Sequence, residues 1–138
     1  MAVRRPHLQV LLPLVLLATC LALATGSPWT RLNKIFRKHH VDFPKTQPGL
    51  PNSYCDMMFE RGIDGRFKNT FIHAPMRSIK RVCSVGGVHI STGLRKSIFQ
   101  FRVTTCRYKP LIGSYTAKTY SRHIIIACWN RLPVLYVE

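Results

Sequence analysis

The chain has 138 residues, which suits a single domain and leaves no room for a second. It carries 21 Lys and Arg residues against five Asp and Glu residues, a formal net charge of +16. An excess this large argues against an ordinary charge-balanced surface. It favours polyanionic partners such as RNA, sulfated glycans or anionic membrane surfaces.

The first 26 residues are typical of a secretory signal peptide. Arg4-Arg5 precedes an apolar run over Val10–Leu23, and either Ala22-Leu23-Ala24 or Ala24-Thr25-Gly26 suits cleavage. A membrane anchor is the alternative, but the run is short for a span and Pro13 interrupts it. We expect a secreted, extracellular domain of residues 27–138, whose net charge falls by two to +14 when the two arginines are removed.

Signal removal leaves four of the five cysteines: Cys55, Cys83, Cys106 and Cys128. Four cysteines in a small exported domain predict two disulfides, for which three pairings are possible. A zinc site is the weaker alternative, because no two of these cysteines have metal-ligand spacing. We expect neither a metal nor a cofactor.

Three short helices are predicted early in the domain, at Thr30–His40, at residues 52 or 53 to Arg61, and at Pro75–Cys83. The first helix has side chains at helical spacing on one face: Leu32, Ile35, Phe36, His39 and His40. In the third helix, Ile79, Val82 and Cys83 are expected to face inward. A loop at Lys45–Pro51 separates the first two helices.

Strands are predicted at Arg66–His73, Ser97–Cys106, within Tyr115–Trp129, and at Leu132–Val137. Turns are expected at Gly86-Gly87 and Pro110–Gly113. Alternation along the first strand puts Arg66, Lys68 and Thr70 on one face. Helices first and antiparallel strands later predict an α+β domain.

Several segments, in this order, resemble the pancreatic-type ribonuclease family. They are Phe36–Asp42, Tyr54–Met58, Arg66–His73, Arg77–Cys83, Phe101–Cys106, His123–Cys128 and Leu132–Val134. The likeness spans about Leu32–Tyr136 and is angiogenin-like in its central segments. It implies a disulfide-stapled, ribonuclease A-like α+β fold with three short helices packed on a bent antiparallel sheet.

The resemblance also implies the disulfide pairs Cys55–Cys106 and Cys83–Cys128. A further pair that is common in the family falls at Gly65 and Gly113 of this chain, so both of its cysteines are missing together.

Cleavage of RNA by internal transfer needs a base, an acid and a cation that stabilises the phosphate. The resemblance makes His40 a latent base, with Arg66 or Lys68 as the candidate phosphate cation. It places His39, Asn69 and Thr70 among the substrate-binding positions, with Thr70 at the position that reads a pyrimidine.

The acid is missing. Its position in the family corresponds to Leu135, and the aspartate that would orient the imidazole corresponds to Val137. We therefore interpret the chain as a catalytically depleted member of the family. His73, His89 and His123 match no catalytic position of the family and do not replace the missing acid.

The leading functional hypothesis is a secreted cationic protein that binds RNA or other polyanions, with absent or very weak ribonuclease activity. One alternative is a weak pyrimidine-preferring endoribonuclease. Another is an antimicrobial, host-defence or reproductive-tract protein, since the basic and apolar segment Arg77–Arg81 suits anionic membranes. A monomer is expected in each case.

Overall fold

A computed structural model of the chain describes residues 13–17, 27–50, 53–63 and 65–138. Residues 13–17 are helical, and the rest of the expected signal peptide, including its cleavage site, lies outside the described residues. Within those ranges no helix is both long and apolar enough to cross a membrane.

The helices lie where the sequence predicts them, with different ends. They are α2 (Pro28–His40), α3 (Tyr54–Met57) with the π-helical turn η1 (Phe59–Ile63), and α4 (Met76–Lys80) with the 3₁₀ turn η2 (Arg81–Cys83). The helix α2 begins two residues before the predicted Thr30, because a proline is well accommodated in the first turn. The predicted second helix is divided into α3 and η1.

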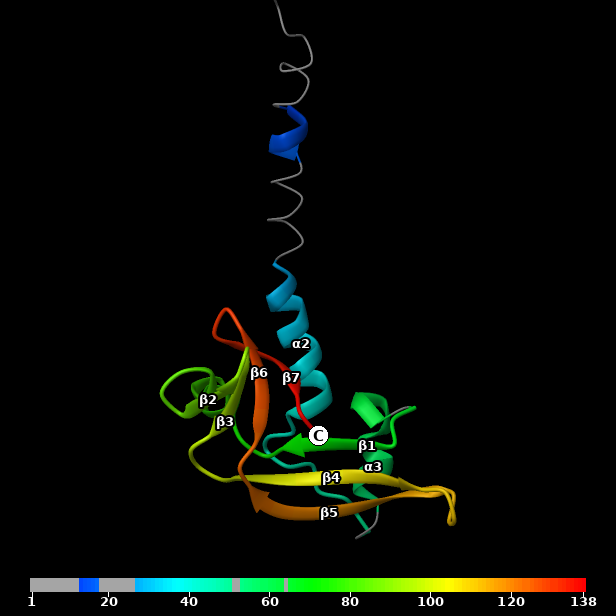
Figure 1. Ribbon diagram of the computed structural model, residues 1–138. Coiled ribbons are helices and arrows are strands. Elements are labelled where there is room, and N and C mark those ends of the chain that lie inside the picture. Colours follow the sequence, from blue (N-terminus) through cyan, green and yellow to red (C-terminus); the bar gives the residue numbers. More distant parts are fainter. Residues whose placement is uncertain (1–12, 18–26, 51–52, 64) are drawn as a thin grey trace, which may run out of the picture.

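The strands form two antiparallel sheets. The first has the order β1-β4-β5, from β1 (Lys68–Ile72), β4 (Phe101–Lys109) and β5 (Ser114–Arg122). The second has the order β2-β3-β6-β7, from β2 (Gly87–Ser91), β3 (Leu94–Ser97), β6 (Ile125–Trp129) and β7 (Leu132–Tyr136). Figure 1 shows β6 running across the direction of β5, so the two sheets are bent relative to each other. The predicted α+β class is confirmed.

The observed strands differ from the predicted ones at three points. The pair β2 and β3 was not predicted, because β2 is exposed over most of its length and shows no alternation of buried and exposed residues. The segment Tyr115–Trp129 holds two strands in different sheets, and the predicted strand Ser97–Cys106 begins instead at Phe101. Ser97 belongs to β3, where its hydroxyl accepts a hydrogen bond from the Ile124 amide.

The inward face of α2 also differs from the prediction. Its buried residues are Asn33, Phe36 and His40, whereas Ile35 is 46% exposed. The Asn33 amide donates a 2.8 Å hydrogen bond to the Pro133 carbonyl of β7, so a polar residue occupies a position facing the second sheet. The third predicted helix is correct in this respect, since Ile79, Val82 and Cys83 are buried.

The end of α2 is fixed to β1 by Asp42. Its backbone N–H donates to the Ile72 carbonyl at 3.0 Å, and its carboxylate accepts a 2.7 Å hydrogen bond from the Tyr54 hydroxyl. Arg61 forms an ion pair with the same carboxylate. Burial alone would raise the pKa of Asp42, but the hydrogen bonds from Tyr54 and Thr46 outweigh it, so that the pKa lies below its ordinary value.

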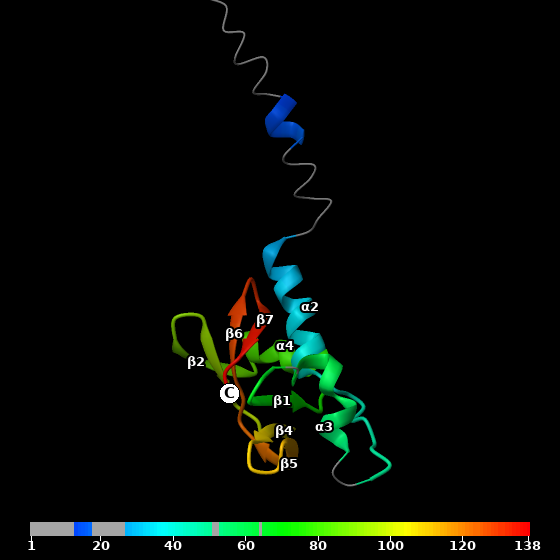
Figure 2. The ribbon, with the colours of Figure 1, turned by 90° about the vertical axis from the view of Figure 1, so that its right-hand side faces the viewer.

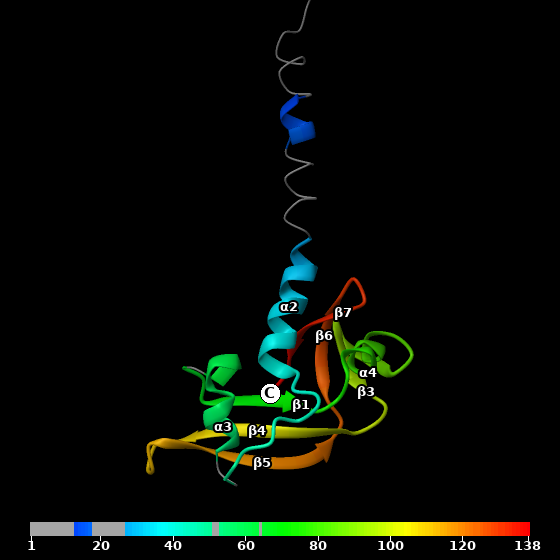
Figure 3. The same ribbon diagram turned by 180° about the vertical axis from the view of Figure 1, so that it is seen from behind.

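Both implied disulfides are present. Cys55–Cys106 ties α3 to β4, and Cys83–Cys128 ties η2 to β6. Figure 3 shows α3 lying against the three-stranded sheet, where Tyr54, Cys55 and Phe71 form part of one of two core clusters.

Candidate functional site

The helix α2 and the strand β1 place His40 in a buried site between the two sheets. The ring is 5% exposed and stacks on Tyr136 of β7 at 5.2 Å between centroids. His40 Nδ1 lies 2.8 Å from the Thr70 carbonyl oxygen. Because a carbonyl can only accept, Nδ1 donates, and the neutral ring keeps its lone pair on Nε2.

The environment makes His40 a weak base. Burial lowers the pKa of its imidazole to about 4, and the positive charge of Arg66 adds to the effect, while the hydrogen bond to Thr70 partly opposes it. The ring is therefore neutral at physiological pH. Its pKa lies well below the value near the operating pH that suits a general base.

Of the two candidate cations, Arg66 is the one whose charge lowers the pKa of both His39 and His40. Its guanidinium donates to the Asn69 side-chain oxygen and to His39 Nδ1, each at 3.2 Å. Burial and the neighbouring Arg66 charge lower the pKa of His39. Lys68 is instead paired across the strands with Arg107. The structure thus groups Arg66, His39 and Asn69, and leaves Lys68 with the basic residues of β4.

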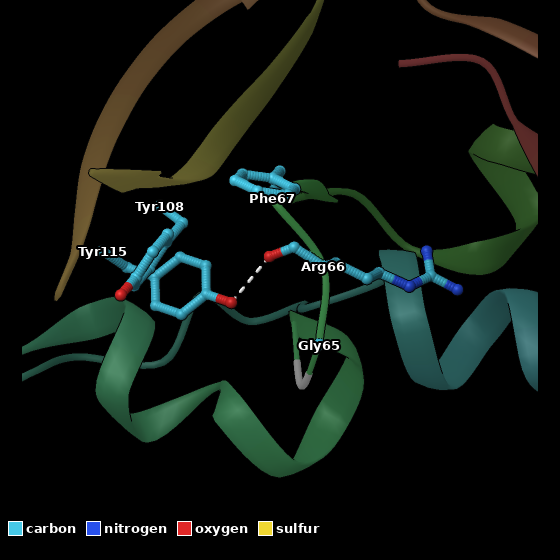
Figure 4. Close-up of a pocket in the computed structure, with 5 residues that line it drawn as sticks. All are labelled: Gly65, Arg66, Phe67, Tyr108 and Tyr115. Atoms are coloured by element: carbon cyan, nitrogen blue, oxygen red, sulfur yellow. Dashed lines mark hydrogen bonds between the residues drawn. The ribbon is translucent and has the colours of Figure 1, made fainter. Parts of the chain in front are cut away.

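Figure 4 shows that Arg66 points its guanidinium away from a small pocket of about 240 Å³ beside it. The pocket is lined by Phe67, Tyr108 and Tyr115 together with Gly65 and the stem of Arg66. The Tyr115 hydroxyl donates to the Arg66 carbonyl at 2.6 Å and also lies 2.9 Å from the Ile63 carbonyl. The phenol therefore holds the segment that leads into β1.

The backbone N–H and the hydroxyl of Thr70 are bound by Glu138, a contact that the sequence did not predict. Its backbone N–H donates to Glu138 Oε1 at 2.5 Å, and its hydroxyl donates to Glu138 Oε2 at 2.7 Å. Both polar groups of Thr70 that face this site are thus bound to one carboxylate. Glu138 lies beyond the last predicted strand, so strand alternation gave no indication of where its side chain would point.

A row of hydrogen bonds continues from Thr70 across the face of the sheet that carries Thr105 and Tyr120. The hydroxyls of Thr70 and Thr105 lie 2.8 Å apart, and those of Thr105 and Tyr120 lie 3.0 Å apart. Arg122 donates to the Tyr120 hydroxyl at 3.3 Å. Thr70 gives its only hydroxyl proton to Glu138, so the Thr105 hydroxyl must donate to Thr70. Each hydroxyl of the row therefore donates to the next one toward the Glu138 carboxylate.

The same face is hollowed next to this row. A concavity of about 410 Å³, here called the β4–β5 concavity, is lined by Thr105, Arg107, Lys109, Thr116, Lys118 and Tyr120. Lys118 also lies 5.7 Å from the centre of the Tyr120 ring. Three cations and one aromatic ring are a combination that suits a single-stranded nucleic acid.

Comparison with known proteins identifies the family of this chain. Residues 31–136 match the family model described as pancreatic ribonuclease. The chain belongs to the pancreatic ribonuclease family. A ribonuclease of Chelydra serpentina is 40% identical over 117 residues, which cover 78% of this chain and 96% of the relative. Mouse angiogenin is 37% identical over 118 residues, which cover 79% of this chain and 78% of the relative.

The fold is that of solved ribonucleases. The crystal structure of green turtle egg white ribonuclease superposes with a TM-score of 0.71 at 35% identity, covering 78% of this chain and 97% of the turtle chain. The relatives carry both names, ribonuclease and angiogenin, so the residues of the site must decide what this family member does.

The residue that the family resemblance places at the acid position, Leu135, lies at the surface. Leu135 of β7 is 58% exposed, and Val137 beyond the strand is 37% exposed. The other histidines of the folded domain are engaged or distant. His73 bonds to the Asp42 carbonyl and the Thr104 hydroxyl, and His123 bonds to the Ser97 carbonyl. Among the described residues, His39 is the only imidazole with a ring contact to His40.

Sequence reasoning missed Glu138, Tyr136, Thr105 and Tyr120. The last two lie on strands whose pairing partners cannot be read from one sequence, although the predicted alternation on β1 already placed Thr70 on the shared face. In the described ranges no group of three or more His, Cys, Asp or Glu side chains is placed to hold a metal ion.

Proposed function

We propose that this chain is a secreted cationic protein of the pancreatic ribonuclease family that binds RNA or related polyanions and cleaves RNA weakly or not at all. The observation that carries the proposal is Leu135 at the position of the family's acid. Without an acid, the departing 5′-oxygen leaves as an alkoxide, and losing a general acid typically costs about 10²- to 10⁴-fold in rate.

Two further observations, besides the missing acid, support low activity. The depressed pKa of His40 weakens the base, and the Glu138 carboxylate binds both polar groups of Thr70 that would contact a pyrimidine. A carboxylate there also repels an approaching phosphate.

Binding is supported by the net charge of +14 expected for residues 27–138 and by the β4–β5 concavity, which is lined by Arg107, Lys109 and Lys118 together with Tyr120. Neutralising phosphates with these cations releases counterions, so affinity should fall as salt rises. Secretion is supported by the apolar leader and by two disulfides, which form in oxidising compartments.

The test is an anisotropy titration of a labelled uridine- and cytidine-containing oligonucleotide at several KCl concentrations. We expect a steep salt dependence for the parent protein and a slope lower by roughly one to two for Lys109→Gln with Lys118→Gln. Lys34→Gln with Lys96→Gln removes the same charge from exposed positions outside the concavity and should change the slope little. Affinity without salt dependence would contradict the proposal.

A weak pyrimidine-preferring endoribonuclease is the second candidate, favoured by the free Nε2 lone pair of His40 beside Thr70. Purified parent protein and His40→Gln should be compared on cytidine- and uridine-containing substrates. Cleavage that is lost in the variant assigns the activity to this site. Equal cleavage by both proteins would identify a contaminant.

A further inference from the structure

A second basic concavity lies on a different part of the molecule from the His40 site. This α4 concavity, of about 450 Å³, is lined by Arg77, Lys80, Arg81, Ser84, Asn130 and Arg131. Its walls are α4, η2 and the turn between β6 and β7, which lie beside each other and away from β4 and β5 in Figure 2. It shares no lining residue with the β4–β5 concavity.

The cations of the α4 concavity are not neutralised within the protein. In the described part of the chain, the side chains of Arg77, Lys80, Arg81 and Arg131 form no ion pair, and the ion pairs that exist there are those of Asp42 with Arg61 and His73. Four positive charges that converge without a carboxylate attract an anion, and the Ser84 hydroxyl and the Asn130 amide add hydrogen-bonding groups.

The turn that supplies Arg131 is strained. Trp129 pairs with Leu132, so Asn130 and Arg131 form a two-residue hairpin turn, with φ angles of 51° and 60°. Asparagine tolerates such a φ, whereas the second position of this turn favours glycine. An arginine is nevertheless held there, and its side chain lines the concavity. Backbone strain of this kind is concentrated at functional sites.

The lining discriminates between classes of polyanion. Among the described residues that line it, none is aromatic, so the site has no platform on which RNA bases could stack. None is apolar either, because Ile79 and Val82 of the same segment are buried in the core. A membrane-binding helix would turn such residues toward the lipid.

We propose that the α4 concavity binds a sulfated polysaccharide, whose sulfate groups pair with Arg77, Lys80, Arg81 and Arg131. A sulfated glycan presents closely spaced anionic groups and has neither aromatic bases nor acyl chains, which matches a lining of cations and polar groups alone. The site is independent of RNA binding at the β4–β5 concavity, so the protein could hold both polymers on separate faces.

The experiment measures binding of a heparin-derived octasaccharide by calorimetry at several salt concentrations. Arg81→Gln with Arg131→Gly should weaken binding at least tenfold and lower the salt slope. Arg131→Gly alone relieves the strained turn, so this variant folds and reports on the loss of one charge. Lys34→Gln with Lys96→Gln is the matched control with the same net charge, and it should keep the parent affinity.

The following outcomes would overturn the proposal or separate it from RNA binding. Equal weakening by the control pair would show attraction by net charge alone and overturn the proposal. Equal weakening of oligonucleotide binding, or loss of binding to phosphatidylserine vesicles, by the α4 pair would assign the concavity to RNA or to lipid and also overturn it. Lys109→Gln with Lys118→Gln should weaken oligonucleotide binding but not octasaccharide binding, so failure of one proposal is distinguishable from failure of the other.

Discussion

At the scale of single residues, activity depends on which groups surround His40. His40 donates from Nδ1 to the Thr70 carbonyl and keeps its lone pair on Nε2, whereas the resemblance places Leu135 at the acid position and Glu138 binds Thr70. The defects are local and lie on one strand and its continuation. They can therefore be reversed separately.

Replacing Leu135→His together with Val137→Asp should raise RNA cleavage about 10²-fold or more over the parent, because an imidazole would be restored at the acid position with a carboxylate to orient it. Adding Glu138→Gln should raise cleavage further by weakening the hold on Thr70. The measurement is steady-state cleavage of a fluorogenic dinucleotide. A folded double variant that binds oligonucleotide and cleaves no faster than the parent would show that the site has diverged beyond its acid.

His40 should also make the fold sensitive to acid. Its pKa is about 4 in the folded protein and near 6.5 when unfolded, so between these values the unfolded chain binds a proton that the folded chain does not. The free energy of unfolding should fall as pH drops through this window, by about 3 kcal/mol in total. Denaturant unfolding from pH 7 to pH 4 measures it.

His40→Gln should flatten this pH dependence, while His89→Gln, at an exposed position on β2, should leave it unchanged. The lowered pKa values of His73 and Asp42 act in the same direction and are common to all three proteins. A parent-like slope in His40→Gln would contradict the assignment.

At the scale of elements, prediction succeeded where a segment has one buried face. The segment of α4 and η2 was placed correctly because Ile79 and Val82 are buried at helical spacing. The strand β1 was also located, although four of its five residues are buried, so both of its faces are covered. Prediction failed for β2, which is stabilised by pairing with β3 rather than by burial. On α2, Asn33 faces β7 and bonds to the Pro133 carbonyl while Ile35 is exposed, and no local pattern predicts such a tertiary contact.

The residues of the candidate site were likewise only partly predictable from the sequence. His39, His40, Arg66, Asn69 and Thr70 were found from family resemblance, and the structure brings these five together. The row from Thr105 to Arg122 depends on strand register, which a single sequence does not fix.

The turn between β6 and β7 provides an element-scale prediction. Arg131 has a φ of 60°, a conformation that costs a side chain with Cβ about 1–2 kcal/mol. Arg131→Gly should therefore raise the free energy of unfolding, by about 1 kcal/mol after the entropy cost of glycine is deducted. Asn130→Gly should have a smaller effect, since asparagine tolerates this region. Thermal unfolding of the two variants at pH 7 compares them, and destabilisation by Arg131→Gly would contradict the strain.

At the scale of the whole molecule, two basic concavities lie on different parts of the surface. The β4–β5 concavity lies on the face of the three-stranded sheet opposite α3, and the α4 concavity lies beside the second sheet. The two disulfides each tie a helical segment to a different sheet. Each concavity is therefore stabilised by the disulfide of its own sheet.

Each disulfide closes a loop of similar size, with sequence separations of 51 and 45 residues. Replacing either pair by alanine should cost about 2–4 kcal/mol in unfolding free energy. Loss of Cys83–Cys128 should in addition weaken octasaccharide binding, because it joins η2 to β6, two walls of the α4 concavity. Urea unfolding and calorimetry on the two double variants test this. Equal effects on octasaccharide binding would contradict it.

The Tyr115 hydroxyl lies where the missing family disulfide would have joined the segment before β1 to the β4–β5 hairpin. A covalent bridge opens only when it is reduced, whereas a phenol that bonds to the Ile63 and Arg66 carbonyls opens whenever those hydrogen bonds break. The peptide bonds near Arg61 and Arg66 should then be cut by trypsin at a rate set by local opening, unaffected by mild reductant. Tyr115→Phe should accelerate that cleavage. The segment that carries Arg66, a candidate phosphate cation, would therefore be released by thermal opening and not by reduction.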